Sequence, residues 1–258
     1  TTTANTDTPD SPSFSTGPEP AVRVRDARKV FGSGTNTINA LDGITIDFPR
    51  GEFTAVMGPS GSGKSTLLHC MSGLDRLTSG TVELAGTDLS TLSDRQLTMV
   101  RRNQIGFVFQ SFNLVPTLTM DENITLPLQL AGREVHSPTF DAVVDRLNIR
   151  DRLKHHPSEL SGGQQQRAAV ARALVSQPEV VFADEPSGNL DTRSSAELLA
   201  MLRAAVDEDG QTIIMVTHDA AAAAFADRVV FLVDGKVVQE LRDPSRDSVL
   251  DAMKHLAE

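Results

Sequence analysis

One glycine-rich stretch, GPSGSGKST at residues 58–66, constrains the fold of this chain more than any other feature. It follows the short apolar run FTAVM at 53–57 and leads into a segment at 64–71 that is typical of a helix. The stretch matches the pattern G-x-x-x-x-G-K-[ST] at Gly58, Gly63, Lys64 and Ser65. Glycines let backbone N–H groups turn toward a phosphate chain, and the helix adds the positive end of its dipole. Strand, loop and helix in this order therefore predict a phosphate-binding loop within an α/β fold.

Two side chains of this glycine loop have expected roles. Lys64 should reach the β- and γ-phosphates of a nucleoside triphosphate, and the Ser65 hydroxyl should bind Mg²⁺. The candidate nucleotide contacts in the loop are Gly58, Pro59, Ser60, Gly61, Ser62, Gly63, Lys64, Ser65 and Thr66. The alternative is a plain glycine-rich turn between a strand and a helix.

A second motif, VVFADEPSGNLD at 180–191, places two carboxylates at the end of an apolar run. Such a run is typical of a strand buried on both faces, so Asp184 would lie at the C-terminal edge of the sheet, beside the glycine loop. There it is a candidate ligand for Mg²⁺. Glu185, the next residue, is a candidate general base that polarises the attacking water. The alternative is that both carboxylates merely cap a strand before Pro186.

Apolar runs and helical periodicity outline the rest of the chain. Further strands are expected at 22–30, 44–48, 105–109, 212–216, 229–233 and 236–240. Helices are expected at 94–102, 121–130, 137–147, 164–176 and 245–256. Because helices dominate from about 93 to 175, we expect a largely helical subdomain inserted into an α/β core with a mostly parallel sheet. Ser137 is expected to be the N-cap of its helix, with Pro138 as the first helical residue.

Composition narrows the class of protein. With 258 residues, the chain is long enough for one large domain with a sizeable core. Its net charge of −10 argues against nucleic-acid binding, which needs a basic surface. The single Cys70 cannot form an internal disulfide, and no run approaches 18 apolar residues, so we expect no membrane-spanning helix. Residues 1–20, rich in Thr, Pro and Ser, are expected to form a disordered tail and have no signal-peptide pattern.

The stretch LSGGQQQR at 160–167 is poor material for a core, yet an apolar-rich helical run follows it. The Ser161 hydroxyl, the Gly163 amide and the start of the helix are able to donate hydrogen bonds to a phosphate. The alternative is a capped helix start with surface glutamines. One nucleotide does not need two phosphate-binding loops in one chain, so the residues alone leave the purpose of this stretch open.

The motifs GPSGSGKST, FVFQSFN, LSGGQQQR, ADEPSGNLD and VTHD stand in the order found in ATP-binding-cassette (ABC) ATPases, and the chain resembles this family from about residue 22 to 240. The resemblance implies a P-loop fold with a mostly parallel core sheet, an antiparallel β subdomain and the inserted helical subdomain. It places the ATPase domain at 21–241, followed by a C-terminal helix at 242–258. It also implies hydrolysis of ATP to ADP and phosphate with Mg²⁺.

The resemblance assigns residues to the two halves of a shared site. In this family two copies pack head to tail, and each ATP lies between one glycine loop and the partner's LSGGQ stretch. The contacts from that stretch are then Ser161, Gly162, Gly163 and Gln164. Gln110 is implied to contact Mg²⁺ and sense the γ-phosphate, and His218 to hold the γ-phosphate and the attacking water. Asp191 is implied to act across the dimer interface.

Adenine is implied to stack on Phe31, at a position where the family usually has an aromatic residue such as tyrosine; a plain core phenylalanine is the alternative. The nucleotide motifs do not by themselves identify what the ATPase drives. The further likeness is to the group of macrolide exporters, lipoprotein-release ATPases and the cell-division cassette, which implies a separate integral-membrane permease and a place on the cytoplasmic face of the membrane. Apolar residues after Gln110, among them Phe112 and Leu114, are expected to receive the permease; packing within the helical subdomain is the alternative. An ABC-type ATPase acting on DNA or chromosomes is the alternative; it is disfavoured because the chain has no basic stripe and no coiled-coil insertion.

Overall fold

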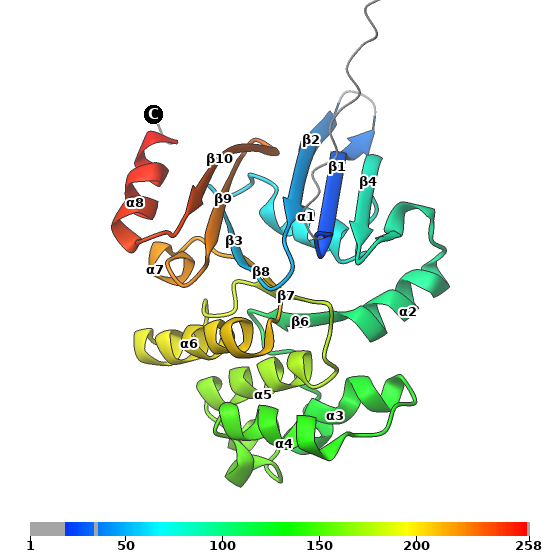
Figure 1. Cartoon of the computed structure of the whole chain (residues 1–258), viewed down its shortest axis with the longest axis vertical. Coiled ribbons are helices and arrows are strands. Elements are labelled where there is room, and N and C mark those ends of the chain that lie inside the picture. The colour runs from blue at the N-terminus through cyan, green and yellow to red at the C-terminus, as the bar shows by residue number, and fades with distance from the viewer. Residues whose placement is uncertain (1–18, 34–35, 257–258) are drawn as a thin grey trace, which may run out of the picture.

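The computed structural model describes residues 19–33 and 36–256, which form two sheets and a group of helices (Figure 1). The tail predicted at 1–20 lies, except for its last two residues, outside the described residues. Within the described part of the chain, no helix is both long enough and apolar enough to cross a membrane.

A six-stranded sheet at the centre carries the phosphate-binding motifs on its strand ends. Its order is β10-β9-β3-β8-β7-β6, and all neighbours are parallel except the β9–β10 hairpin. The strands are β3 (Phe53–Met57), β6 (Ile105–Phe109), β7 (Val180–Asp184), β8 (Ile213–Val216), β9 (Arg228–Val233) and β10 (Lys236–Arg242). Every residue of β3 and β8 is buried, as expected for parallel strands covered on both faces.

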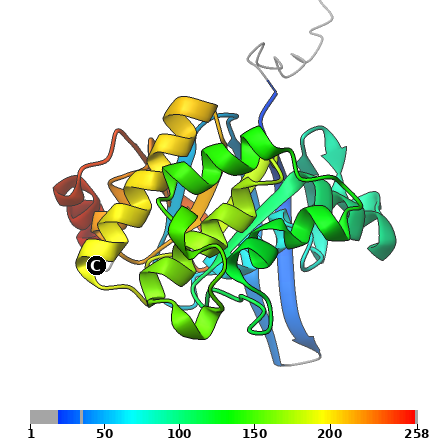
Figure 2. The ribbon, with the colours of Figure 1, turned by 90° about the horizontal axis from the view of Figure 1, so that it is seen from below.

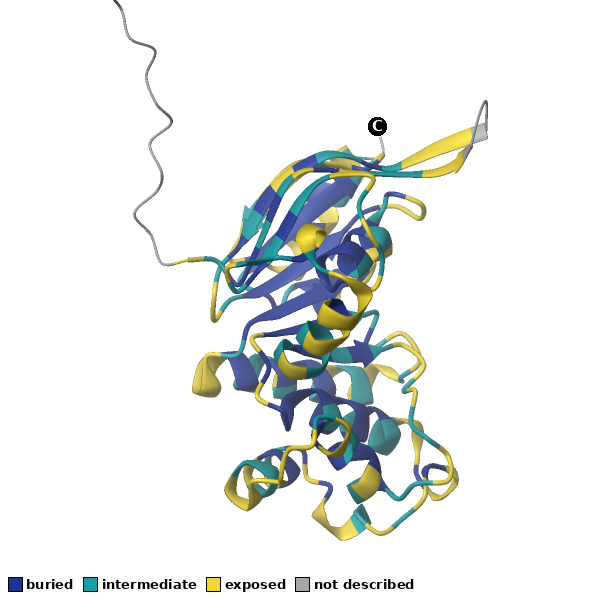
Figure 3. Ribbon diagram, turned by 90° about the vertical axis from the view of Figure 1, so that its right-hand side faces the viewer, coloured by how far each residue is buried: buried dark blue, intermediate teal, exposed yellow. Residues whose placement is uncertain are grey.

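A four-stranded antiparallel sheet, in the order β2-β1-β4-β5, packs on the face of the central sheet opposite to the helical subdomain. Its strands are β1 (Val22–Ser33), β2 (Asn36–Phe48), β4 (Ser79–Leu84) and β5 (Thr87–Asp88). Helix α1 (Lys64–Met71) lies between the sheets and contacts strands of both. The far end of the β1–β2 ribbon is exposed and projects from the body of the protein (Figure 3). The predicted combination of a parallel core with an antiparallel β subdomain is confirmed.

Helices α2 (Asp94–Gln104), α3 (Met120–Leu130), α4 (Ser137–Arg146) and α5 (Gly162–Leu174) form most of the expected helical subdomain. Seen from below, α3, α4 and α5 lie in front of the core strands (Figure 2). The range 93–175 also contains β6, which pairs with β7 and is therefore an edge strand of the core sheet. Helix α4 has His136 as its N-cap, so Ser137 is already helical and the N-cap prediction is wrong.

Three further helices complete the core: α6 (Thr192–Asp209), α7 (Ala220–Ala223) and α8 (Arg246–His255). Helix α6 is not among the helices expected from the sequence, although its signals are present. Asp191 caps its first turn, apolar residues recur with helical spacing, and Gly210 ends it with φ +66°. Two buried clusters meet across the sheet, because Phe53, Ala55 and Met57 face α6 and the helical subdomain whereas Val56 faces α1 and the antiparallel sheet.

Candidate nucleotide site

The glycine loop is shaped by close contacts that only glycine allows. A Cβ at Gly58, where φ is +152°, would lie 2.0 Å from the Leu232 carbonyl oxygen. A Cβ at Gly63, where φ is +98°, would lie 2.2 Å from the Ala40 oxygen. The loop is also tied to the β9–β10 turn, because the Gly235 amide donates to the Ser62 carbonyl at 3.0 Å. Tertiary packing thus holds the loop at the start of α1, with its amides close to the positive end of the helix.

Lys64 is buried within this loop. Its Nζ donates to the carbonyl oxygens of Gly58 at 2.9 Å and Pro59 at 2.8 Å. Burial lowers the pKa of Lys64, while the charges of Glu185 and Asp184 act in the opposite direction. A phosphate is a stronger partner for this ammonium than two neutral carbonyl groups, because the hydrogen bond to it is charge-assisted.

The two predicted carboxylates lie beside the glycine loop. Asp184, the last residue of β7, accepts a hydrogen bond from the Ser65 hydroxyl at 3.3 Å. Burial raises the pKa of Asp184, although His69, Ser65 and Lys64 favour its charged form. Ser65 and Asp184 therefore present two oxygen atoms to the same point, as a Mg²⁺ site requires.

Glu185 turns away from the strand and meets His218. Its backbone has φ +47°, and its amide donates to the Val216 carbonyl at 2.9 Å, which holds this residue at the end of β8. Nδ1 of His218 lies 3.0 Å from Oε1 of Glu185. The two residues that sequence reasoning assigns to water and γ-phosphate are thus in direct contact, with His218 exposed and Glu185 half-buried.

Gln110 follows β6 and reaches the segment after Glu185. Its Nε2 donates to Oδ1 of Asn189 at 3.5 Å, and Nδ2 of Asn189 donates back to the Gln110 carbonyl at 3.0 Å. A Cβ at Gly188 would lie 2.8 Å from Nε2 of Gln110, so a side chain there would displace it. Asn189, which sequence reasoning passed over within SGNLD, therefore joins the Gln110 loop to the Asp184–Glu185 strand end.

The LSGGQ stretch (Leu160–Gln164, called the signature stretch below) is a capped helix start. The Ser161 hydroxyl accepts from the Gln164 amide at 3.3 Å, and the Gln164 side chain accepts from the Ser161 amide at 2.9 Å. In the three other such caps with a hydroxyl residue at the N-cap, at Ser93, Thr119 and Ser245, the capping hydroxyl also donates to the partner side chain. Among the described residues the Ser161 hydroxyl, which is exposed, donates to no protein acceptor, so its proton is available to a ligand.

The glutamines after the signature stretch are structural, not surface residues. Gln165 Nε2 donates to the Pro157 and Leu160 carbonyl oxygens at 3.0 and 3.1 Å. Gln166 is fully buried, and its Nε2 donates to the Pro186 carbonyl at 2.6 Å. The signature helix α5 is therefore bonded directly to the residue that follows Glu185. The repetition of glutamine was visible in the sequence, but the partner of Gln166 is 20 residues away and could not be predicted.

Phe31 and Asp191 occupy surface positions. Phe31 is 44% exposed on the projecting β1–β2 ribbon, which excludes the plain core interpretation of that residue. Asp191 caps α6, and its carboxylate accepts from the amides of Arg193 and Ser194 and from the Ser194 hydroxyl. The hydrogen bonds from Ser194 and Arg193 lower the pKa of Asp191.

Within one chain, the glycine loop and the signature stretch lie in different parts of the molecule. The nearest neighbours of Gly162 and Gly163 are Phe112, Leu190 and Ser194, none of which belongs to the glycine loop. Helix α1 lies between the two sheets, whereas α5 packs on α3, α4, α6 and β6 (Figure 1). The other predicted residues do assemble: Lys64, Ser65, Asp184, Glu185 and His218 form one continuous group at the ends of β3, β7 and β8.

A buried lysine in a glycine loop at the start of a helix, with an aspartate ending another parallel strand of the same sheet, defines a P-loop nucleoside triphosphatase. The family profile described as ABC transporter matches residues 41–188. The chain belongs to the ABC transporter family and is its ATP-binding component, an ATPase of the cassette type.

Known proteins support this assignment over most of the chain. The bacitracin export ATP-binding protein BceA of Halalkalibacterium halodurans is 41% identical over 231 residues, covering 88% of this chain and 91% of that protein. The macrolide export ATP-binding/permease protein MacB of Brucella melitensis is 43% identical, but the match covers 34% of its length. A dimeric structure of the cassette MJ0796, bound to ADP and phosphate, superposes with a TM-score of 0.78 at 38% identity and covers 87% of this chain and 99% of that one.

Proposed function

We propose that this chain is an ATP-hydrolysing subunit that pairs head to tail with a second copy around two Mg-ATP molecules and thereby drives a membrane permease. The observation that carries the proposal is the separation of the glycine loop from the signature stretch within one chain. Each of the two stretches offers hydrogen-bond donors to a phosphate. Because they lie far apart in one chain, they cannot bind the same ATP molecule within that chain. The related cassette MJ0796 forms dimers in its solved structures, which supports pairing of two copies.

The oxygen ligands at the site fit Mg²⁺. Ser65 and Asp184 are in contact, and Gln110 adds a carboxamide from the neighbouring loop. Among the described residues, no cluster of three or more His, Cys, Asp or Glu side chains could hold a metal alone. This matches a cation that takes one or two protein oxygens and completes its shell with phosphates and water. When bound, Mg²⁺ would neutralise negative charge on the phosphate oxygens.

For hydrolysis, Glu185 is placed to accept the proton of the attacking water. The new bond forms between the water oxygen and the γ-phosphorus, and the bond from that phosphorus to the bridging oxygen of ADP breaks. The contact with His218 fixes the direction of the Glu185 carboxylate. Lys64, which donates to the Gly58 carbonyl in this structure, would donate instead to the phosphate chain. Ser161 and Gly163 of the second copy would bind the γ-phosphate from the opposite side, so its release on hydrolysis lets the copies separate.

The permease is proposed to dock beside the Gln110 loop. A groove of about 250 Å³ opens there between β6, α3 and α5, lined in part by Phe107, Phe109 and Asn113. Phe112 is half-buried next to Gly162, and Leu114 packs against the large core cluster, so this loop joins the groove to the signature helix. The names of the related bacitracin and macrolide export proteins favour efflux. We propose that the permease is of the macrolide-exporter type, with lipid extraction or force transmission as the alternatives to efflux and with this subunit on the cytoplasmic face of the membrane.

Substitution Glu185→Gln tests the proposed function. It keeps the shape and the contact with His218 but removes the proton acceptor, so we expect the ATPase rate to fall by about 10²- to 10⁴-fold while ATP still binds. Retained ATP should then hold two copies together. ATPase assays and size-exclusion chromatography with Mg-ATP measure both effects.

A matched control is Glu197→Gln, which changes a carboxylate on α6 that pairs with Arg167 and Arg193 outside the site. This variant should keep normal turnover. Normal turnover by Glu185→Gln would instead remove Glu185 from its role. A Glu185→Gln protein that binds Mg-ATP yet stays monomeric at high concentration would contradict the paired site.

A further inference from the structure

Lys29, on β1, has a set of contacts that the proposed mechanism does not use. Its ammonium donates to Oδ1 of Asp75 and to the Arg76 carbonyl, both at 2.7 Å. The same ammonium lies 4.9 Å from the centre of the Phe31 ring, two residues further along the strand. The Lys29 side chain is only 13% exposed, so most of its length is packed while its charge is shared between an anion and an aromatic face.

The loop at 75–78, whose Asp75 and Arg76 accept hydrogen bonds from Lys29, is also bonded to β1 through Thr78. The Thr78 amide donates to the Arg28 carbonyl at 2.8 Å, and the Val30 amide donates to the Thr78 hydroxyl at 3.0 Å. These bonds fix β1 on both sides of Lys29. Phe31 comes immediately after Val30, the last residue of β1 that is bonded to this loop, and lies on the exposed part of the ribbon.

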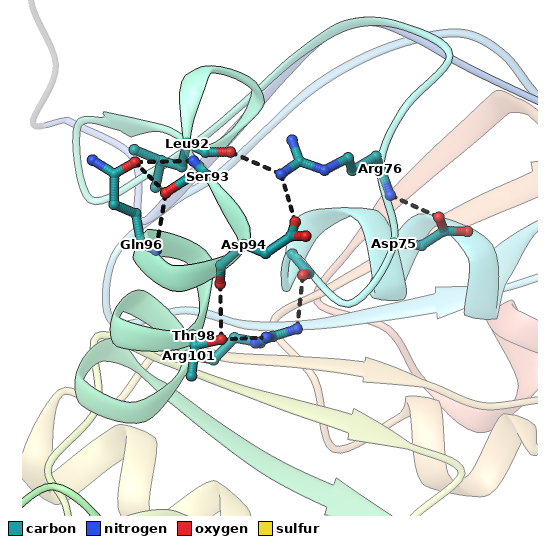
Figure 4. A network of polar contacts seen from close by, with 9 residues as sticks. Asp75, Arg76, Leu92, Ser93, Asp94, Gln96, Thr98 and Arg101 are labelled. Atoms are coloured by element: carbon teal, nitrogen blue, oxygen red, sulfur yellow. Dashed lines mark hydrogen bonds and ion pairs between the residues drawn. The ribbon is translucent and has the colours of Figure 1, made fainter.

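The same loop and the residues just before it are hydrogen-bonded to helix α2 and to the residues that precede this helix (Figure 4). Arg76 donates to the Leu92 carbonyl at 2.8 Å and to Asp94 at 2.9 Å. Arg101 of α2 donates to the Gly73 carbonyl at 3.1 Å. Burial alone would raise the pKa of Asp75, yet the hydrogen bonds from Lys29 and the Arg76 amide, with the charge of Lys29, hold it below its ordinary value. Asp75 is therefore an ionised anchor on a rigid base.

We propose that Lys29 is a positioning residue, which orients the Phe31 ring as a platform for the nucleotide base. The proposal rests on the proposed role of Phe31 in base stacking. A phenylalanine on an exposed ribbon has rotational freedom that a base would have to remove on binding. An ammonium anchored by Asp75 on one side of the ring favours one ring orientation in advance and leaves the other side for the base.

The test compares a ligand that has a base with one that lacks it. Dissociation constants are measured for Mg-ADP and for Mg-pyrophosphate by competition against a fluorescent ADP, so that no hydrolysis intervenes. Lys29→Met keeps the packed stem and removes the charge. We expect it to weaken Mg-ADP about two- to fivefold, as a cation–π contact at a partly exposed site allows, and to leave Mg-pyrophosphate unchanged.

Further variants separate a positioning role from a structural one. Asp75→Asn, which removes the anchor but no atom near the ring, should weaken Mg-ADP in the same selective way. Lys29→Arg keeps a cation beside the ring, so its affinity for Mg-ADP should stay close to that of the unchanged protein. Lys29→Met in a Phe31→Ala background should cause no additional loss. Lys254→Met, which removes a lysine from an exposed Lys–Asp pair on α8 far from Phe31 in the chain, controls for the loss of one positive charge and should leave the binding of both ligands unchanged.

The possible outcomes separate this proposal from the role of Phe31. If Phe31→Ala leaves Mg-ADP binding unchanged, the platform itself is wrong and the Lys29 proposal with it. If Phe31→Ala weakens Mg-ADP selectively but Lys29→Met does not, only the positioning role is overturned. Equal weakening of both ligands by Lys29→Met, or loss of folding seen by circular dichroism in Lys29→Met and Asp75→Asn but not in Lys29→Arg, would show that the Lys29–Asp75 pair serves the fold alone.

Discussion

Asp184 is a half-buried carboxylate at the end of a buried strand, and in the free protein this position is unfavourable for its charge. Burial raises its pKa, so around the ordinary carboxyl pKa the folded state holds its proton more tightly than the unfolded state does. The contribution of Asp184 to the free energy of unfolding therefore falls as the pH rises through this range and then stays constant. The function proposed for Asp184, to bind a cation, accounts for a carboxylate at a position where its charge is unfavourable in the free protein.

Because the buried charge of Asp184 lowers the free energy of unfolding, removing this charge should stabilise the fold while it abolishes activity. Without Mg²⁺ and nucleotide, Asp184→Asn should raise the midpoint of thermal unfolding at pH 7, and the gain should shrink toward zero as the pH falls to about 4. Its Mg²⁺-dependent ATPase activity should be lost. Thermal denaturation at several pH values, with an ATPase assay, measures these effects.

Asp209 supplies a control of opposite sign. A hydrogen bond from Arg146 lowers the pKa of Asp209, so its carboxylate stabilises the fold above the ordinary carboxyl pKa, and this contribution is lost as the pH falls below it. Asp209→Asn should therefore lower the unfolding midpoint at pH 7. A lower midpoint for Asp184→Asn as well would mean that its contact with Ser65 outweighs the cost of burial.

Helix α5 connects the signature stretch to the segment around Glu185, two motifs that are separate in the sequence. Its first residues form the signature stretch, and Gln166, one turn further, bonds to the Pro186 carbonyl beside Glu185. In a head-to-tail pair, the first turn of this helix would face the ATP bound by the partner, while Gln166 supports the residue that acts on the chain's own ATP. The two ATP sites would thus share one rigid helix.

Gln166→Leu tests whether this bond supports catalysis. The substitution leaves the buried Pro186 carbonyl without its donor, which costs about 1–3 kcal/mol. We expect a lower unfolding midpoint together with a reduced kcat and nearly unchanged ATP affinity. Gln211→Leu breaks a similar bond, from Gln211 Nε2 to the Pro178 carbonyl at 3.1 Å, away from the site. It should lower stability without lowering kcat, so an equal fall in kcat for both variants would reduce the Gln166 bond to a stability effect.

The whole molecule presents two different edges of its core sheet. β10 ends one edge, and β6 ends the other beside the helical subdomain, where Phe107 and Phe109 stack with ring centres 5.3 Å apart. The Arg172 guanidinium, at the far end of α5, donates to the Phe112 and Asn113 carbonyl oxygens at 2.9 and 2.6 Å. The β6 edge is therefore in contact with the signature helix, which is in turn bonded to the loop that follows Gln110.

Coupling to the permease should depend on this edge. Phe109→Ala shortens a half-buried ring of the groove while leaving Leu114 in the core, so the cassette alone should keep its ATPase rate and lose most of the stimulation by the permease. ATPase assays on the cassette with and without the permease in vesicles measure the ratio. Val238→Ala, an exposed apolar residue on β10, is the control at the opposite edge and should keep full stimulation. Unchanged stimulation of Phe109→Ala would place the docking surface elsewhere.

Most elements and most chemical groups of the site were predictable from local sequence. Strand β3, helix α1 and the apolar part of β7 follow from short patterns, because a buried strand and a glycine loop impose their residue types within a few positions. The position of Asp184 beside the glycine loop also followed, since β3 and β7 end at the same edge of a parallel sheet and Ser65 lies in the first turn of the helix after β3. Helix α6 was not predicted although its capping and spacing are local, because its N-cap, Asp191, ends a motif that was interpreted only for its function.

Tertiary structure alone decided which partners the polar side chains take. Gln166 and Pro186 are 20 residues apart, Lys29 and Asp75 are 46 apart, and Gln110 and Asn189 are 79 apart. No periodicity links such pairs, because each is created by the packing of one element on another. The sequence determined the kind of chemistry, since glycine, lysine and carboxylates are required locally. The fold determined that the two phosphate-binding groups of one chain do not meet, because α1 and α5 pack on different parts of the molecule.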